Sequence, residues 1–158
     1  MERLALREER DRVLVDSTVE VGGDRIRYSL ELSPLWAFRS LLLRRGEREL
    51  RLARTHCAWT VDGERRADLA AAVDIDLALS PFTNTLPIRR LRLPVGASAE
   101  IVTSYVGLDL TVQPDGQRYT RLDERRYRYE ALDGGFEREI EVDGAGLVVD
   151  YPGLFARA

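Results

Sequence analysis

A period-two alternation of apolar and polar residues is the feature that most constrains this chain of 158 residues. Residues 25–32 show it most clearly, because isoleucine, tyrosine and leucine alternate there with arginine, serine and glutamate. Successive side chains of a β-strand point to opposite faces, so this pattern predicts a strand with one buried face. Residues 13–21 carry the same alternation, and Gly22 and Gly23 between the two segments favour a tight hairpin turn.

Turn-forming residues recur at roughly ten-residue spacing along the rest of the chain, as in antiparallel sandwiches and barrels. The strands expected in the second half are residues 101–106, 108–112, 117–122, 127–131 and 136–142, with turns at 114–116, 133–135 and 143–144. No helical period persists over a normal helix length, although residues 65–72 suit one or two helical turns. Residues 1–12 fit either a short helix or an edge strand. We therefore predict a single, nearly all-β domain over residues 1–158, with a large, curved antiparallel sheet.

Composition excludes several classes of protein. The formal net charge of −3 argues against a general nucleic-acid binder, and every basic residue apart from one histidine is arginine. Cys57 is the single cysteine, so no intramolecular disulfide can form. The N-terminus is charged where a signal peptide needs an apolar core, and no apolar run reaches the length of a membrane span. We expect a soluble, cytoplasmic protein without an integral membrane segment.

Residues 80–91, SPFTNTLPIRRL, concentrate unusual residues in one stretch. Two prolines restrict the backbone, and the short polar side chains between them can bond to nearby backbone and stabilise a turn. The stretch ends with a basic pair, Arg89 and Arg90. We predict a rigid polar loop, which either binds a ligand through its basic pair or braces the sheet.

Catalytic motifs are absent. His56 and Cys57 are neighbours in an expected strand, so they should face opposite sides, with Cys57 buried and His56 at the rim. One histidine and one cysteine do not supply a metal-ligand set. Asp74 and Asp76 share one face of an alternating segment, and paired carboxylates can perform acid–base chemistry, although such a face is more often solvated. We predict no catalytic residue, metal or cofactor, with an enzyme that uses Asp74 or Asp76 as the less favoured alternative.

Aromatic side chains are spread over many of the expected strands. A curved sheet can collect such side chains in a concave interior that receives an apolar ligand, although ordinary core packing explains them equally well. The candidate contacts for an apolar chain are Trp36, Trp59, Tyr105 and Tyr119, and those for a polar or anionic head group are Asn84, Arg89 and Arg90. The alternative is a non-catalytic structural or protein-interaction module, in which Asn84 satisfies buried groups and the arginines pair with carboxylates such as Asp150.

The same stretch, residues 80–91, resembles the signature of a bacterial family described as putative glycolipid-binding, formerly a domain of unknown function. The similarity continues at residues 117–120 (QRYT), 127–130 (YRYE) and 146–155 (GLVVDYPGLF), and at Trp36 before Arg39 and Trp59 before Asp62 and Gly63. The resemblance implies a spiral β-roll, a many-stranded antiparallel meander similar to bacterial lipoprotein-carrier folds. It also implies a glycolipid or another amphipathic molecule as partner, and it brings no catalytic residues. The ligand's identity and the oligomeric state are left open.

Overall fold

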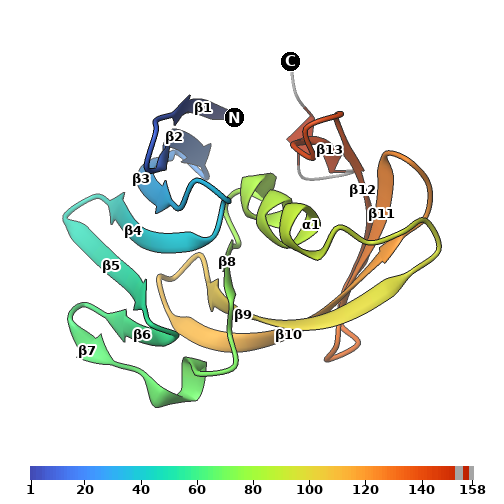
Figure 1. The fold of residues 1–158 in the computed structure, drawn as a ribbon. Coiled ribbons are helices and arrows are strands. Elements are labelled where there is room, and N and C mark those ends of the chain that lie inside the picture. Colours follow the sequence, from blue (N-terminus) through green and yellow to red (C-terminus); the bar gives the residue numbers. More distant parts are fainter. Residues whose placement is uncertain (152–154, 157–158) are drawn as a thin grey trace.

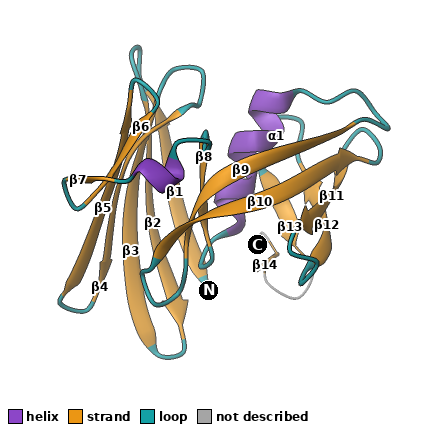
Figure 2. Cartoon of the chain, turned by 90° about the horizontal axis from the view of Figure 1, so that it is seen from below, coloured by secondary structure: helices purple, strands orange, loops and turns teal. Residues whose placement is uncertain are grey.

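The chain folds into two seven-stranded sheets with one short α-helix between them (Figures 1 and 2). The computed structural model describes residues 1–151 and 155–156, with side chains as far as residue 150. The first sheet is a large antiparallel meander, and the second curls strongly around the helix (Figure 1). The prediction of a mostly β protein with a large curved sheet is confirmed.

The first sheet, sheet A, contains seven strands that pair in chain order, each antiparallel to the next. They are β1 (Glu2–Glu8), β2 (Val13–Val21), β3 (Asp24–Leu32), β4 (Phe38–Arg45), β5 (Arg48–Thr55), β6 (Ala58–Val61) and β7 (Glu64–Arg65). The predicted β2–β3 hairpin is confirmed, and Gly22 and Gly23 form its turn with φ of 57° and 87°. Every second residue of β3 is buried, as its alternation predicts. The ambiguous N-terminal segment forms an edge strand, β1.

The second sheet, sheet B, contains the remaining seven strands in the order β14-β13-β12-β11-β10-β9-β8. They are β8 (Asp74–Leu77), β9 (Ser98–Val106), β10 (Val112–Arg121), β11 (Arg126–Ala131), β12 (Glu137–Val142), β13 (Val148–Tyr151) and β14 (Phe155–Ala156). All neighbours pair antiparallel except β8 and β9, which run parallel. A parallel pair needs a crossover connection, and here it is supplied by the 3₁₀ helix η2 (Pro81–Asn84) and the helix α1 (Thr85–Leu91).

Helix α1 lies in the hollow of sheet B, between the two sheets (Figure 1). Its Leu86 belongs to the core cluster formed with sheet A and β8, while its Ile88 belongs to the cluster inside the curl of sheet B. The second cluster also contains Leu93, Tyr119, Tyr127, Tyr129, Ile140, Val142 and Val148. The helix therefore connects the two cores and fills the hollow that the curvature of sheet B creates.

The prediction of a loop at residues 80–91 is wrong, because this stretch is η2 followed by α1. Pro87 is the third residue of α1, within the first turn, where the missing N–H removes no intrahelical hydrogen bond. The Ser80 hydroxyl accepts a hydrogen bond from the Phe82 N–H and caps η2. Arg92 ends α1 in the left-handed conformation, with φ of 46°. Each proline thus lies in the first turn of a helix instead of bounding a loop.

Two boundaries in sheet B also differ from the prediction. The expected turn at residues 114–116 lies inside β10, where Pro114 is tolerated because β11 pairs with β10 only from Gln117 onward. The expected strand at residues 108–112 is mostly a turn, in which the Asp109 carboxylate accepts hydrogen bonds from the N–H and hydroxyl of Thr111. The short helical segment expected within residues 65–72 is confirmed as a 3₁₀ helix, η1 (Ala67–Leu69).

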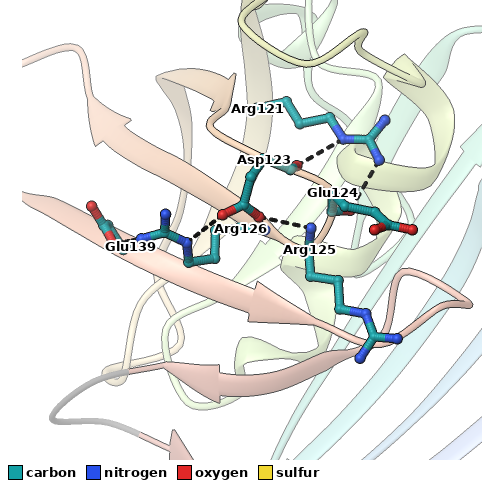
Figure 3. A network of polar contacts seen from close by, with 6 residues as sticks. All are labelled: Arg121, Asp123, Glu124, Arg125, Arg126 and Glu139. Carbon is teal, nitrogen blue, oxygen red and sulfur yellow. Dashed lines mark hydrogen bonds and ion pairs between the residues drawn. The ribbon is translucent and has the colours of Figure 1, made fainter.

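A network of charged side chains fixes the turn between β10 and β11 (Figure 3). The Asp123 carboxylate accepts hydrogen bonds from the backbone N–H groups of Arg125 and Arg126 and from the Arg126 guanidinium at 2.6 Å. These bonds, led by the one from Arg125, lower the pKa of Asp123. Arg121 donates to the carbonyl oxygens of Asp123 and Glu124 on one side and of Leu93 on the other. The network ties the turn to the chain that follows α1 through Leu93, and to β12 through the ion pair of Arg126 with Glu139 at 3.4 Å.

Candidate ligand-binding site

The two aspartates of β8 are buried, so the prediction that they lie on a solvated face is wrong. All four residues of β8 are buried, because sheet A covers one side of this strand and η2 and α1 cover the other. Asp74 is 2% exposed and forms a bidentate ion pair with Arg90, with an Nη2–Oδ2 distance of 2.6 Å. Arg90, predicted as a head-group contact, therefore anchors α1 to β8.

Asp76 is the centre of a buried polar network between β8, η2 and β10. Its carboxylate accepts a hydrogen bond from the Thr83 hydroxyl at 3.1 Å and one from the Gln117 amide at 2.7 Å. Burial raises the pKa of Asp76, and these two hydrogen bonds oppose the rise. The Thr83 oxygen also accepts the backbone N–H of Leu77. Because each carboxylate oxygen has a protein donor, this network braces the crossover connection.

Four of the seven predicted ligand contacts are buried against other parts of the protein. Trp59 stacks on Phe38 with ring centroids 4.9 Å apart, and its indole N–H donates to the Ala72 carbonyl at 3.0 Å. The Asn84 amide donates to the Tyr119 hydroxyl at 2.8 Å. Trp59 belongs to the cluster with sheet A and Tyr119 to the cluster inside sheet B, so the structure does not bring these two together.

Trp36 and Arg89 do meet. The Arg89 guanidinium lies 3.9 Å from the centroid of the Trp36 ring and donates a hydrogen bond to the Ala145 carbonyl. Trp36 is buried in the β3–β4 connection with φ of 65°, while Arg89 is half-buried. Tyr105 is half-buried on β9, and burial followed by the charge of Asp76 raises its pKa. The predicted contacts thus do not form one cluster, and only Arg89 and Arg90 belong to α1 itself.

His56 and Cys57 are the two central residues of the β5–β6 turn and both are exposed. Their φ values of 50° and 66° fit a two-residue hairpin turn with positive φ at both positions. The prediction of a buried Cys57 is therefore wrong, because the residue lies in the turn and not in a strand. Within the described part of the chain, no group of three or more histidine, cysteine, aspartate or glutamate side chains could hold a metal ion.

The outer face of sheet A carries a groove that the sequence-based predictions missed. The strands bury one face against β8, η2 and α1, and the side chains that alternate with the buried ones form the outer face. A hollow of about 500 Å³ lies on this outer face, and half-buried Leu14, Leu42 and Ala53 line it. Its polar margin includes Arg7, Asp16, Ser29, Glu31, Ser40 and Arg51.

A second hollow of about 380 Å³ adjoins the first, since Asp16 and Ser29 line both. Arg3, Thr18 and Arg27 also line it. We call the two hollows together the outer groove. The sequence does contain a signal for the outer groove. Residues 41–43 of β4 are three consecutive leucines, so Leu42 lies on the outward face of the strand, where alternation predicts a polar residue.

The fold and the groove define a class: a mostly β protein in which a helix fills the curled sheet B and a groove lies on the outer face of sheet A. The chain belongs to the family described as Putative glycolipid-binding, which residues 1–157 match. It is similar to a crystal structure, at 1.80 Å resolution, of a DUF1089 family protein from Pseudomonas aeruginosa. The two share 37% sequence identity with a TM-score of 0.82, over 99% of this chain and 92% of the other.

Comparison with curated proteins gives no match. Among the described residues, no helix is long and apolar enough to cross a membrane. The resemblance noted in the sequence is thus confirmed at the level of family and fold.

Proposed function

We propose that this protein binds an amphipathic ligand, a glycolipid or a similar molecule, along the outer groove. The observation that carries the proposal is a hollow of about 500 Å³ on an outward-facing sheet surface, lined by leucines and bordered by hydroxyl and charged groups. Leucines on the outer face of a sheet gain nothing from the core, but they can cover an acyl chain. The hydroxyl and charged margin suits the hydroxyls of a sugar, and the family's description names glycolipids.

The energetics of such a site are adequate. Burying about ten methylene groups of a ligand gives roughly 8 kcal/mol before the costs of association. A micromolar dissociation constant needs about 8 kcal/mol net, so contacts to the head group must supply the difference. A groove with an apolar floor and a polar margin offers both kinds of contact, and no special motif is needed.

The hollow of sheet B is the second place to consider, because three of the sequence-predicted contacts, Asn84, Arg89 and Tyr119, belong to it or to the helix that fills it. Binding there would engage Trp36, Tyr105 and Arg89 from the sides of α1. The outer groove has the stronger support, since α1 and the tyrosines of sheet B already occupy that hollow.

Titration with dodecyl glucoside below its micellar concentration, followed by native mass spectrometry and calorimetry, tests the proposal. Leu42→Glu places a charge on the floor of the outer groove and should weaken binding about tenfold or more, since a buried leucine contact contributes about 1.5–3 kcal/mol. Leu108→Glu is the matched control, because Leu108 is 45% exposed and lies outside the groove. If Arg89→Ala loses binding while Leu42→Glu binds normally, the ligand does not lie in the outer groove, and a site beside α1 is favoured instead. No binding of any amphiphile by the wild type would overturn the function and favour a structural or protein-interaction module.

A further inference from the structure

Three side chains form a row across β1, β2 and β3 on the outer face of sheet A. Arg3 lies opposite Thr18, and Thr18 lies opposite Arg27. Directly opposed residues of antiparallel strands have Cβ atoms about 4.5–5.5 Å apart, so the two arginines flank one threonine hydroxyl. All three residues line the second hollow of the outer groove.

The two arginines of this row have no carboxylate partner in the part of the chain that the structure describes. Among the described residues, neither Arg3 nor Arg27 has an aspartate or glutamate oxygen within 4.0 Å, whereas Arg7 pairs with Asp16 and Arg51 pairs with Glu49 on the same face. Asp16, which lines both hollows, also accepts the Ser29 hydroxyl at 2.6 Å. Arg3 and Arg27 are both exposed. Guanidinium groups bind phosphate and carboxylate oxygens through two parallel N–H donors, so a pair without partners suits an anion.

The two outward-facing leucines of the outer groove lie beyond this row along the strand direction. The row of Arg3, Thr18 and Arg27 is followed, two residues further along the strands, by a row of Ala5, Asp16, Ser29, Leu42 and Arg51. The next row contains Arg7, Leu14, Glu31, Ser40 and Ala53. The charged side chains of these two rows form ion pairs, Arg7 with Asp16, Arg51 with Glu49, and Glu31 with Arg12 and Arg39. Each two-residue step advances about 7 Å, so the three rows span a distance similar to that of an acyl chain of about ten carbons.

We propose that the ligand of the outer groove is anionic at its polar end, a phosphate or carboxylate head group held by Arg3 and Arg27 with Thr18. Its apolar chain lies over Leu42 and Leu14. This inference rests on the proposed function and adds the charge of the ligand and its direction in the groove.

The test compares two amphiphiles with the same chain and ring, dodecyl glucoside and dodecyl glucuronide, which differ in one carboxylate. By calorimetry at low ionic strength, the wild type should bind the glucuronide about tenfold more tightly, and the preference should shrink at 0.5 M salt because exposed charges are screened there. The double variant Arg3→Gln, Arg27→Gln should lose the preference and keep its affinity for the glucoside. The control Arg10→Gln, Arg125→Gln removes the same charge from two exposed arginines that lie outside the groove and form no ion pair among the described residues. It should bind like the wild type.

The outcomes separate the two proposals. Equal affinity of the wild type for both amphiphiles, or a preference that survives in Arg3→Gln, Arg27→Gln, overturns the anionic head group while the apolar groove stands. No affinity for either amphiphile overturns the proposed function itself. Binding to anionic vesicles without any affinity for the monomeric glucuronide would overturn this inference in favour of a membrane-surface role.

Discussion

Replacing Arg90 tests whether α1 is anchored by its ion pair with Asp74. In Arg90→Ala, the bidentate partner of Asp74 disappears and the carboxylate remains in a site that is 2% exposed. A buried charge without a partner is strongly destabilising, because neither water nor another protein group replaces the lost hydrogen bonds. We expect Arg90→Ala to fold less stably and to loosen the connection between β8 and β9.

The magnitude follows from the burial of the two partners. Removing one partner of a buried pair costs about 3–5 kcal/mol, and we expect about 3 kcal/mol because the Arg90 side chain is 34% exposed. For a domain of this size, each kcal/mol lowers the melting temperature by about 2–4 °C, so the shift should be about 6–12 °C. Urea titration followed by tryptophan fluorescence measures the free energy, and calorimetry measures the melting temperature.

Two further variants make the result specific. Asp74→Asn in the Arg90→Ala background removes the stranded charge and should recover a large part of the loss. Arg118→Ala breaks the ion pairs of Arg118 with Glu100 and Glu130, and it should cost about 0–1 kcal/mol because the Arg118 side chain is 39% exposed. If Arg90→Ala costs no more than Arg118→Ala, the anchoring role of Arg90 is refuted, and the side chain becomes available for the head-group role that the sequence suggested.

Two other predictions concern the polar groups beneath α1. Burial raises the folded-state pKa of Asp76 above its ordinary value of 3.8, so the unfolded chain loses this proton at a lower pH than the folded protein does. The free energy of unfolding of the wild type should therefore fall, relative to that of Asp76→Asn, as pH rises from below 3.8 through the folded-state pKa. Urea midpoints of both proteins measured from pH 3.5 to pH 8 check this, and a difference that is constant with pH would contradict it. Tyr119→Phe removes the acceptor of the Asn84 amide and should cost about 1–3 kcal/mol, whereas Tyr105→Phe on half-buried β9 should cost less in the same urea titration.

The strands of sheet A could be predicted because each is half-buried and its turns have distinct residues. The β2–β3 hairpin shows this most clearly, since alternation in both strands and two glycines between them specify one register. A one-residue slip would expose Ile26 and Leu30 and bury Arg25 and Arg27. Local sequence is therefore sufficient to predict a strand and its register when burial of one face supplies most of the strand's stability.

Helix α1 could not be predicted, because its stability comes from tertiary contacts. It has seven residues, too few for a stable isolated helix, and Pro87 argues against helix locally. Burial of Leu86 and Ile88 in two different cores and the pairing of Arg90 with Asp74 stabilise it instead. The parallel pairing of β8 with β9 could not be predicted either, because it requires a crossover connection and α1 forms part of that connection.

The outer groove escaped prediction for a different reason. An outward-facing leucine is common on protein surfaces, so a single strand gives no warning of a binding site. Only the register between strands brings Leu14 and Leu42 into one hollow, and that register depends on pairing across several hairpins. That Arg3 and Arg27 have no carboxylate partner among residues 1–150 likewise depends on which carboxylates the fold brings near them.

A ligand inside the curl of sheet B would first have to displace α1, and the contacts of that helix set the cost. Breaking the Arg90–Asp74 pair costs about 3–5 kcal/mol, and exposing Leu86 and Ile88 costs about 1.5–3 kcal/mol each. Losing the hydrogen bond between Asn84 and its buried partner adds about 1–3 kcal/mol. The total is about 7–14 kcal/mol, comparable to or greater than the roughly 8 kcal/mol that micromolar binding supplies. The outer groove requires no such displacement, so an amphiphile of ordinary affinity should bind on the outer face and leave α1 in place.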